Sequence, residues 1–382
     1  MMKRICVITV ILLLLLIGVL LGWQYHESAK NAFFHTVHSV GHNAMHSVAA
    51  ETKSYGTSAT IGEIGDVLLH DWVYEDAKKS SGYQFDKMLA KVKPMLEKPD
   101  FLIANEESIP AGESMGISSY PIFNSPFEIV DTLKRNGVDL ISSANNHAMD
   151  KGPRGILSAI QYYEKKGMPY VGINKNQADQ KRLRVFNVNG ISVAVLAYTF
   201  GTNGIPIPDG KGYLVNVIDE PKMIEDIQDA RKHAEVVVLS IHWGNEYVRK
   251  PNEIQKKLAK DLANAGADII FGHHPHVLEP IEKIKCTDDR NAVVVYSLGN
   301  FLSGQLWDYK DIGGLATVDI HKKIDGDNKT IKIGEVNFEP TFVLSKHFRH
   351  YEVLPLKDAY REGLVDHSPD EIENFMFSSI SH

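Results

Sequence analysis

The sequence predicts an α/β fold in which helices cover β-sheets. Beyond Thr60, short runs of β-branched residues alternate with longer stretches of helical periodicity. The short runs end in polar or glycine-rich loops, and several helical stretches end at a glycine, as is typical of a helix C-cap. Strand followed by helix, repeated in this way, indicates helix-covered sheets, and in such folds the strand ends carry the chemistry.

The candidate strands are short apolar runs. They are Thr60–Ile64, Phe101–Ala104, Leu140–Ser142, Val193–Tyr198, Val236–Ile241, Ile269–Phe271 and Val293–Tyr296. The candidate helices are Asp86–Leu96, Ser125–Asn136, Ile156–Lys166, Pro221–His233 and Asn252–Ala265, and glycine follows three of them at positions 137, 167 and 266. From about Gly313, apolar and polar residues alternate around the turn Asp325-Gly326-Asp327-Asn328, which predicts added antiparallel strands.

Composition excludes several classes of protein. The 382 residues suffice for one large α/β domain with appendages or for two modest domains. With 43% hydrophobic and 23% charged residues, the chain is not disordered, collagen-like or disulfide-built. A net charge of −7 argues against a nucleic-acid partner, because phosphates need excess Lys and Arg. Cys6 lies in an apolar run far from Cys286, so we expect no internal disulfide.

The N-terminus predicts a membrane anchor. Lys3 and Arg4 precede an apolar stretch, Ile5–Gly22, which at about 1.5 Å per residue nearly crosses a hydrocarbon core of roughly 30 Å. Trp23 follows without a small-x-small cleavage site, which favours an uncleaved signal anchor over a cleaved signal peptide. We therefore expect a single-pass protein of the cell membrane, with its N-terminus in the cytoplasm and its main domain extracellular.

Five parts of the chain follow from these patterns. We expect a cytoplasmic tip and transmembrane anchor over 1–25, a polar stalk over 26–58 and the main domain over 59–310. A C-terminal β extension of that domain covers 311–365, and a flexible tail covers 366–382.

In the stalk, four histidines at positions 35, 38, 42 and 46 share one helical face. A surface segment is favoured there over a metal site, because no carboxylate or cysteine accompanies them.

Five loops, each just after an apolar strand, bring together side chains that can bind metal. They are Gly65-Asp66-Val67-Leu68-Leu69-His70, Asn105-Glu106-Glu107, Ala144-Asn145-Asn146-His147, His242-Trp243-Gly244-Asn245-Glu246 and Gly272-His273-His274-Pro275-His276. Each loop alone is a weak signal, since an Asp after a strand is commonly a helix cap and a lone His is commonly structural. Together they indicate a metal site at one end of the sheets.

The ligand types suggest which metals would bind. Two divalent cations a few ångströms apart need a carboxylate between them, with imidazoles and amide oxygens in the remaining positions. Oxygen and nitrogen ligands without thiolate suit Mn, Fe, Zn or Mg. His274 and His276 would share a face of an extended chain, with Pro275 stiffening the loop, whereas His273 would point away and pack behind.

With these residues in view, the sequence resembles the CapA family. This family comprises membrane-anchored proteins linked to poly-γ-glutamate capsule synthesis, within the calcineurin-like metallophosphoesterase superfamily. The matching segments are "GDVLLHDWVYEDA" from Gly65, "NEES" from Asn105, "SYPIFNSP" from Ser119, "SSANNHAMDKG" from Ser142, "HWGNEY" from His242, "GADIIFGHHPHVLEPIE" from Gly266 and "VVYSLGNFLSGQ" from Val294. The resemblance covers about Thr60 to Gln305.

The resemblance implies a four-layer fold, with two β-sheets packed face to face between helices. It implies two divalent metal ions: one held by Asp66, Glu107 and His276, the other by Asn146, His242 and His274, with a shared carboxylate. His147 would be the catalytic general acid. The matching loops add His70, Asn124, Ser125, Glu246 and Asn300 as possible site residues; Trp243 is better interpreted as packing.

The chain departs from the superfamily at two points. The usual D-x-H opening is absent, because the first histidine after Asp66 is His70, four residues on. The usual bridging aspartate is also absent, and Glu107 takes its place. A one-metal site therefore remains an alternative.

Two functions of different classes are compatible with these features. In the first, the chain is an anchored component of poly-γ-glutamate synthesis or export that assembles with membrane-embedded polymer synthase or export subunits. In the second, it is an extracytoplasmic metal-dependent phosphoesterase or hydrolase acting on a cell-envelope substrate unrelated to capsule. Either way, an anionic polymer or phosphoester is the expected substrate.

Overall fold

The computed structural model describes residues 54–380. The expected anchor, Ile5–Gly22, and most of the expected stalk lie outside this range. Among the described residues, no helix is both long and apolar enough to cross a membrane. The stalk boundary predicted at residue 58 is wrong, because β1 (Ser54–Leu68) already pairs with β14 from Ser54 onward.

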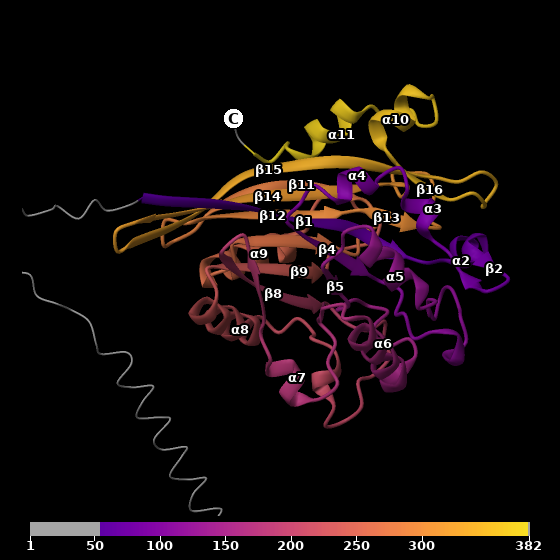
Figure 1. Cartoon of the computed structure of the whole chain (residues 1–382), viewed down its shortest axis with the longest axis horizontal. Helices are drawn as coiled ribbons and strands as arrows, with labels where there is room; N and C mark the ends of the chain where they lie inside the picture. The colour runs from indigo at the N-terminus through magenta and orange to yellow at the C-terminus, as the bar shows by residue number, and fades with distance from the viewer. Residues whose placement is uncertain (1–53, 381–382) are drawn as a thin grey trace, which may run out of the picture. The chain divides into compact units, whose positions relative to one another are not determined.

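The first sheet has eight strands, and β1 runs through its centre (Figure 1). The order is β16-β15-β14-β1-β4-β5-β6, and β13 also pairs with β1. Besides β1, the strands are β4 (Phe101–Glu106), β5 (Leu140–Ser142), β6 (Tyr170–Val171), β13 (Asn300–Ser303), β14 (Ile312–Asp325), β15 (Asn328–Leu344) and β16 (Glu352–Pro355). β1, β4, β5 and β6 are parallel neighbours, whereas β14, β15 and β16 are antiparallel. The expected β extension therefore continues the sheet that contains β1.

The second sheet has six strands in the order β11-β12-β10-β9-β8-β7. They are β7 (Arg184–Val188), β8 (Ile191–Thr199), β9 (Val236–His242), β10 (Ile269–His273), β11 (Leu278–Lys285) and β12 (Asn291–Leu298). The four central strands are parallel, and antiparallel β7 and β11 form the edges. A small separate hairpin joins β2 (Lys78–Lys79) to β3 (Gly82–Tyr83).

Four of the five predicted helices begin and end within four residues of the predicted positions. The helices are α2 (Asp71–Ala77), α3 (Asp86–Leu89), α4 (Lys93–Leu96), α5 (Glu128–Arg135), α6 (Gly152–Lys166), α7 (Gln177–Lys181), α8 (Glu220–His233), α9 (Glu253–Ala265), α10 (Leu356–Arg361) and α11 (Pro369–Met376); short 3₁₀ turns cover Glu113–Met115 and Gly212–Leu214. Of these, α2, α7, α10 and α11 were not predicted. The predicted single helix Asp86–Leu96 is wrong: it is the two short turns α3 and α4. Pro94 explains the break, because it has no N–H to donate to the preceding turn.

Three apolar layers hold the domain together. One lies between the two sheets and includes Ile61 of β1 and Phe271 of β10. A second joins the first sheet to helices α2 to α6, and a third joins the second sheet to α8 and α9. The order is thus helices, sheet, sheet, helices, and the mixed α/β class predicted from the sequence is confirmed.

The C-terminus differs from the prediction of a flexible tail over 366–382. Residues 369–376 form α11, whose Ile372 and Met376 are fully buried in the layer between the sheets. The Ser368 side chain caps the first turn by accepting a hydrogen bond from the Glu371 amide. α11 contacts both β15 and β11, and Figure 1 shows it alongside β15 in yellow. The C-terminal helix therefore closes the sandwich where strands of both sheets meet.

Candidate metal centre

The sequence-predicted ligands come together where parallel strands of both sheets end. Asp66 lies near the end of β1, Glu107 directly follows β4, and His242 is the last residue of β9. His274 and His276 follow the end of β10. All five side chains are buried. The parallel direction of these strands brings segments as distant as residues 66 and 276 to one place.

Glu107 is common to two groups of potential ligands. Asp66, Glu107 and His276 offer atoms within 4.8 Å of one another, and so do Glu107, His242 and His274. The Nε2 atom of His242 lies 3.3 Å from Oε1 of Glu107 and 3.0 Å from Oδ1 of Asn146. The first group has the residues that the family resemblance implies; the second shares His242 and His274 with the implied set, and Asn146 reaches it through His242.

The chemistry of these atoms fits divalent cations. In the described chain, neither Glu107 oxygen has a hydrogen-bond donor, and Nδ1 of His274 also lacks a partner. Burial raises the pKa of Glu107 to about 8 and lowers the pKa of His274 to about 2. Buried polar atoms without partners are costly. Glu107 without donors beside His242 and His274, two imidazoles whose pKa burial lowers, is the arrangement that a cation would stabilise.

Asp66 is held from behind by a chain of buried polar groups. Its Oδ1 accepts hydrogen bonds from Nδ2 of Asn105 (2.8 Å) and Nδ1 of His273 (3.0 Å), while Oδ2 lies 3.2 Å from Nδ1 of His276. Nε2 of His273 donates to Oε1 of Glu63 (2.9 Å), which also accepts from Oγ of Ser240 (2.7 Å). The Oδ2 atom of Asp66, which also accepts a hydrogen bond from the His274 amide (3.4 Å), therefore faces the cluster.

The pKa values agree with this arrangement. Burial alone would lower the pKa of His273, but the carboxylates of Glu63 and Asp66 raise it to about 10. Against the same burial, hydrogen bonds from His273 and His276 hold the pKa of Asp66 well below its usual range. His273 bonds to Asp66 from behind and belongs to none of the ligand groups of the described residues, which agrees with the expectation that it packs behind the site. Glu63 was not predicted from the sequence.

His147 is oriented by a neighbouring carboxylate. Its Nδ1 lies 2.7 Å from Oδ2 of Asp150, which also accepts a hydrogen bond from the Phe123 amide (2.6 Å). The Phe123 ring packs edge-on against the imidazole, with centroids 4.6 Å apart. Oδ1 of Asn145 accepts a hydrogen bond from the His147 amide. With Nδ1 engaged, Nε2 is the nitrogen left for proton transfer; Asp150, three residues on, was missed from the sequence.

The other possible site residues divide into two sets. Asn300 and Glu246 lie beside the cluster. The side-chain oxygen of Asn300 lies 3.2 Å from Nδ1 of His276. The exposed carboxylate of Glu246 lies within 4.8 Å of ligand atoms on His274 and His276. Asn124, by contrast, bonds within its own loop, to the carbonyls of residues 112 and 116. The hydroxyl of Ser125 donates to that of Ser108.

His70 and two aromatic residues complete the surroundings. Nδ1 of His70 accepts a hydrogen bond from the Gly304 amide (3.2 Å), and burial lowers its pKa to about 4. His70 belongs to neither ligand group built on Glu107. Phe200 lies 4.5 Å from His274 and Tyr247 lies 6.0 Å from His276, both measured between ring centroids. These half-exposed rings form an aromatic rim that was not predicted.

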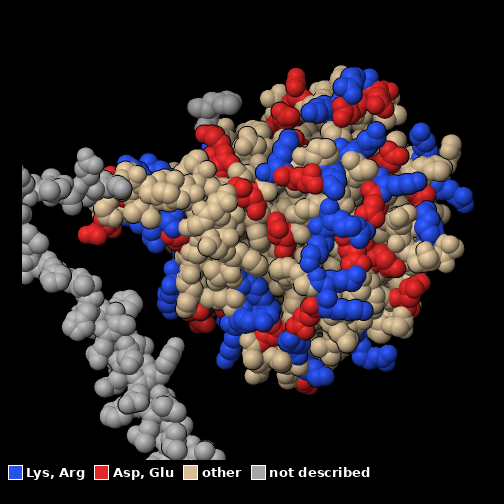
Figure 2. Space-filling model, in the orientation of Figure 1, with Lys and Arg blue, Asp and Glu red and all other residues tan. Residues whose placement is uncertain are grey.

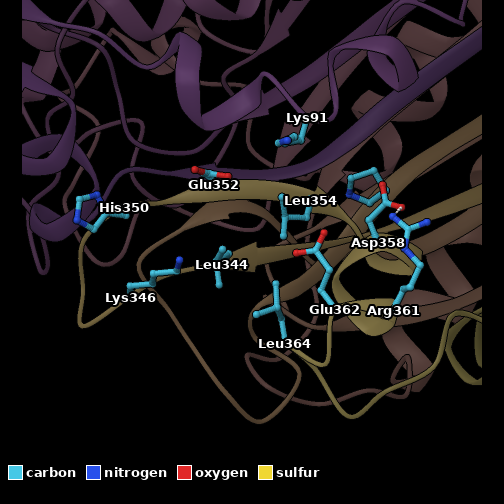
Figure 3. A pocket seen from close by; sticks show the side chains of 11 residues that line it. Lys91, Leu344, Lys346, His350, Glu352, Leu354, Asp358, Arg361, Glu362 and Leu364 are labelled. Atoms are coloured by element: carbon cyan, nitrogen blue, oxygen red, sulfur yellow. Dashed lines mark ion pairs between the residues drawn. The ribbon is translucent and has the colours of Figure 1, made fainter.

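Surface hollows elsewhere do not involve the cluster. Figure 3 shows one of about 700 Å³, lined by Lys91, Lys346, Glu352 and Glu362 and by Arg361, which pairs with Asp358. None of the sequence-predicted site residues lines it.

The fold and this cluster define a layered α/β protein with a candidate centre for divalent metal. Residues 60–305 match the family described as "Bacterial capsule synthesis protein PGA_cap", and the chain belongs to that family. The resemblance to CapA proteins seen in the sequence motifs is thereby confirmed.

Two capsule proteins of the genus Bacillus are similar to the chain. The "PGA biosynthesis protein CapA" of Bacillus subtilis is 34% identical over 64% of this chain and 63% of its own length. The "Capsule biosynthesis protein CapA" of Bacillus anthracis is 32% identical over 82% of this chain and 77% of its own length. The match thus spans less than two thirds of the first relative.

A solved structure is only distantly similar. The sulfate thiohydrolase SoxB of Thermus thermophilus, in complex with glycerol, aligns over 78% of this chain and 46% of that chain, with 17% identity and a TM-score of 0.38. A likeness at this level carries no functional conclusion.

Proposed function

We propose that this chain is a membrane-anchored component of capsular poly-γ-glutamate synthesis or export that acts through a divalent-metal centre. The observation that carries the proposal is Glu107: a buried carboxylate without hydrogen-bond donors in the described residues, shared by two groups of ligands. Membership of the capsule synthesis family supports the polymer. The names of the two Bacillus relatives, which refer to capsule and PGA biosynthesis, support it as well.

In this proposal the domain is of the calcineurin-like metallophosphoesterase type. Asp66, Glu107 and His276 hold one cation, and His242 and His274, with Asn146, hold the second. When bound, the cations supply Lewis-acid polarisation of a phosphoryl or carbonyl oxygen and lower the pKa of a water molecule. The layered architecture and the position of the cluster at the strand ends support this assignment.

His147 acts as the general acid. Asp150 holds its Nδ1, so the protonated imidazole donates from Nε2 to the leaving oxygen of the substrate. The Asp66 carboxylate, fixed by Asn105 and His273, keeps Oδ2 oriented towards the cluster.

The apolar run Ile5–Gly22 anchors the chain in the cell membrane, with the main domain extracellular. In this position the domain meets the polymer as membrane-embedded synthase or export subunits release it. Bound metal also suits an anionic polymer as substrate. A polyanion that approaches a chain of net charge −7 is repelled unless cations compensate the negative charge.

A second candidate function is an extracytoplasmic hydrolase acting on an envelope substrate unrelated to capsule. The His147–Asp150 pair favours it, because an oriented general acid beside a metal cluster is a requirement of hydrolysis and not of scaffolding. The two functions differ in whether His147 is needed for polymer formation.

The test combines metal analysis with capsule formation. Full-length protein is purified as wild type and as Glu107→Gln, and bound Mn, Fe, Zn and Mg are measured by mass spectrometry. We expect wild type to retain divalent metal and the variant to lose most of it, because Glu107 belongs to both ligand groups. Absence of metal from wild-type protein after incubation with each ion would contradict the proposal.

The capsule assay uses a polymer-forming host that lacks its own copy of the gene. Complementation with Glu107→Gln or His147→Gln should yield little poly-γ-glutamate, while Lys346→Met, altered in the hollow of Figure 3, should restore wild-type amounts. Normal polymer with His147→Gln, together with lost hydrolysis of phosphodiester model substrates, would favour the second function.

A further inference from the structure

The loop between β13 and β14 is tied to the candidate metal centre at its backbone. Asn300, whose side-chain oxygen lies 3.2 Å from Nδ1 of His276, donates its amide hydrogens to the carbonyl of Lys310 (2.8 Å) and to Oε1 of Gln305 (3.2 Å). The Lys310 backbone is therefore connected to His276 through a single residue.

The side chain of Lys310 returns to the same place by another route. Its ammonium lies 5.4 Å from the centroid of the Tyr247 ring, and that ring lies 6.0 Å from the imidazole of His276. Nε2 of Gln305 donates to the Tyr247 hydroxyl (3.3 Å). The Lys310 ammonium, the Gln305 amide and the Tyr247 hydroxyl thus lie close together, and the Tyr247 ring lies between Lys310 and His276.

An unusual backbone holds Lys310 in this position. The three residues before it, Trp307, Asp308 and Tyr309, have φ values of 62°, 49° and 65°, a left-handed run that side chains other than glycine disfavour. Such backbone persists where the surroundings enforce it, and it is common at ligand sites. Here the Arg249 guanidinium lies 3.8 Å from the Tyr309 ring centroid and 3.9 Å from that of Phe375 in α11.

The Lys310 ammonium has spare capacity for a ligand. Its ion-pair partner is Asp308, at 3.4 Å, and that side chain is 89% exposed. A pair of this length is weak when one partner is as well solvated as the Asp308 carboxylate. The Lys310 side chain itself is only 24% exposed, so its charge is less screened than that of a free surface lysine.

The wider surface makes a local cation important. On the face shown in Figure 2, acidic and basic residues are interspersed, and the chain carries a net charge of −7. Because charges of both signs are mixed on this face, they attract an approaching anionic polymer only weakly. Recognition of its charged groups must depend on individual cations positioned near the cluster.

We propose that Lys310, together with Tyr247 and Gln305, forms a subsite that binds an anionic group of the substrate next to the candidate metal centre. The ammonium pairs with a carboxylate or phosphate oxygen, the Gln305 amide donates a hydrogen bond, and the Tyr247 ring packs against the aliphatic part of the chain. The inference rests on the proposed function, which supplies the centre that the subsite adjoins.

The test measures binding by full-length protein in mild detergent. The probes are a poly-γ-glutamate oligomer and an oligophosphate of matched charge, each titrated at several salt concentrations. We expect Lys310→Met to weaken binding of the preferred probe about tenfold, the equivalent of one charge-assisted hydrogen bond, and to lower the salt slope by about one. Lys310→Arg should retain affinity within about threefold, because the positive charge remains.

Lys346→Met is the matched control, since Lys346 lines the hollow of Figure 3 and contacts none of the subsite residues. The probe whose affinity falls identifies the anion: the glutamate oligomer indicates a carboxylate, the oligophosphate a phosphate. The inference is overturned if wild type binds neither probe, if Lys310→Met binds both within twofold of wild type, or if Lys346→Met loses as much affinity as Lys310→Met.

Metal content separates this inference from the proposed function. Lys310→Met should keep wild-type metal and an unchanged thermal unfolding midpoint, which excludes misfolding as the cause of weaker binding. If wild type holds no divalent metal but Lys310→Met still loses affinity, the metal function fails and the anion subsite stands. If metal is present and affinity does not depend on Lys310, the subsite fails alone.

Discussion

Replacing Glu63 should destabilise the domain strongly. Glu63 is fully buried on β1, and its Oε1 accepts hydrogen bonds from Ser240 (2.7 Å) and His273 (2.9 Å) on the facing sheet. The carboxylates of Glu63 and Asp66 raise the pKa of His273 to about 10 against the effect of burial, so the imidazole carries a proton at neutral pH. Glu63→Ala leaves that buried charge with one carboxylate instead of two and leaves the Ser240 hydroxyl without its acceptor.

The magnitude follows from these lost partners. A buried donor without an acceptor costs about 1–3 kcal/mol, and removing one member of a buried charge pair costs about 3–5 kcal/mol. We expect Glu63→Ala to lower the free energy of unfolding by about 3–5 kcal/mol. Glu63→Gln should cost about 1–3 kcal/mol, because the amide oxygen still accepts from one of the two donors.

Urea unfolding followed by circular dichroism measures the difference. The chain from Thr52 onward, which forms one compact unit, is used with a chelator present so that metal binding does not add to stability. Ser240→Ala is the control, since it removes one hydrogen bond to Glu63 and leaves His273 paired; its cost should be about 1 kcal/mol. The reasoning is refuted if Glu63→Ala costs less than about 1 kcal/mol or no more than Ser240→Ala.

Three further predictions concern the supports around the site. Burial raises the pKa of Glu279 to about 8, so its contribution to stability is fully present below about pH 4.5 and is lost as the pH rises through 8. The free energy of unfolding should fall by at most about 5 kcal/mol over this range. Glu279→Gln should flatten the decline of the urea midpoint between pH 5 and 8. Met376→Ala should lower the free energy of unfolding by about 2–5 kcal/mol, and a loss under about 1 kcal/mol would mean that α11 does not dock. Arg249→Met should cost about 1–2 kcal/mol in the same assay, because the guanidinium lies between the Tyr309 and Phe375 rings; an equal loss in exposed Arg349→Met would contradict this.

The central strands were predictable because each is a buried parallel strand with an apolar run. β5 has the predicted bounds, and β9 extends the predicted strand by one residue, His242. Parallel strands must end at the same edge of a sheet, so the polar residues that follow them had to converge. This explains why the five polar loops could be placed at one end of the sheets from loop position alone, whereas the grouping of Asp66, Glu107 and His276 came from the family resemblance.

Local breaks and the C-terminus were harder to predict. Apolar periodicity continues through Asp86–Leu96 and hides the effect of Pro94, which splits the segment into two turns. The residues of α11 are mostly polar in sequence; Ile372 and Met376 are its fully buried side chains, and Phe375 is partly buried against the same layer. Two apolar residues four positions apart make too short a stripe to identify a docked helix before its partner strands are known.

Glu63 and Asp150 were missed for different physical reasons. Asp150 stands three residues after His147, a spacing at which side chains in a turn can meet, so the local sequence already contained that signal. The partners of Glu63, by contrast, are 177 and 210 residues away in sequence. Its signal is indirect: a carboxylate within the apolar run of β1 cannot be buried without a donor or a counter-charge. A charged residue in a strand that leads to a metal cluster therefore predicts a buried partner, and the cluster's own histidines are the first candidates.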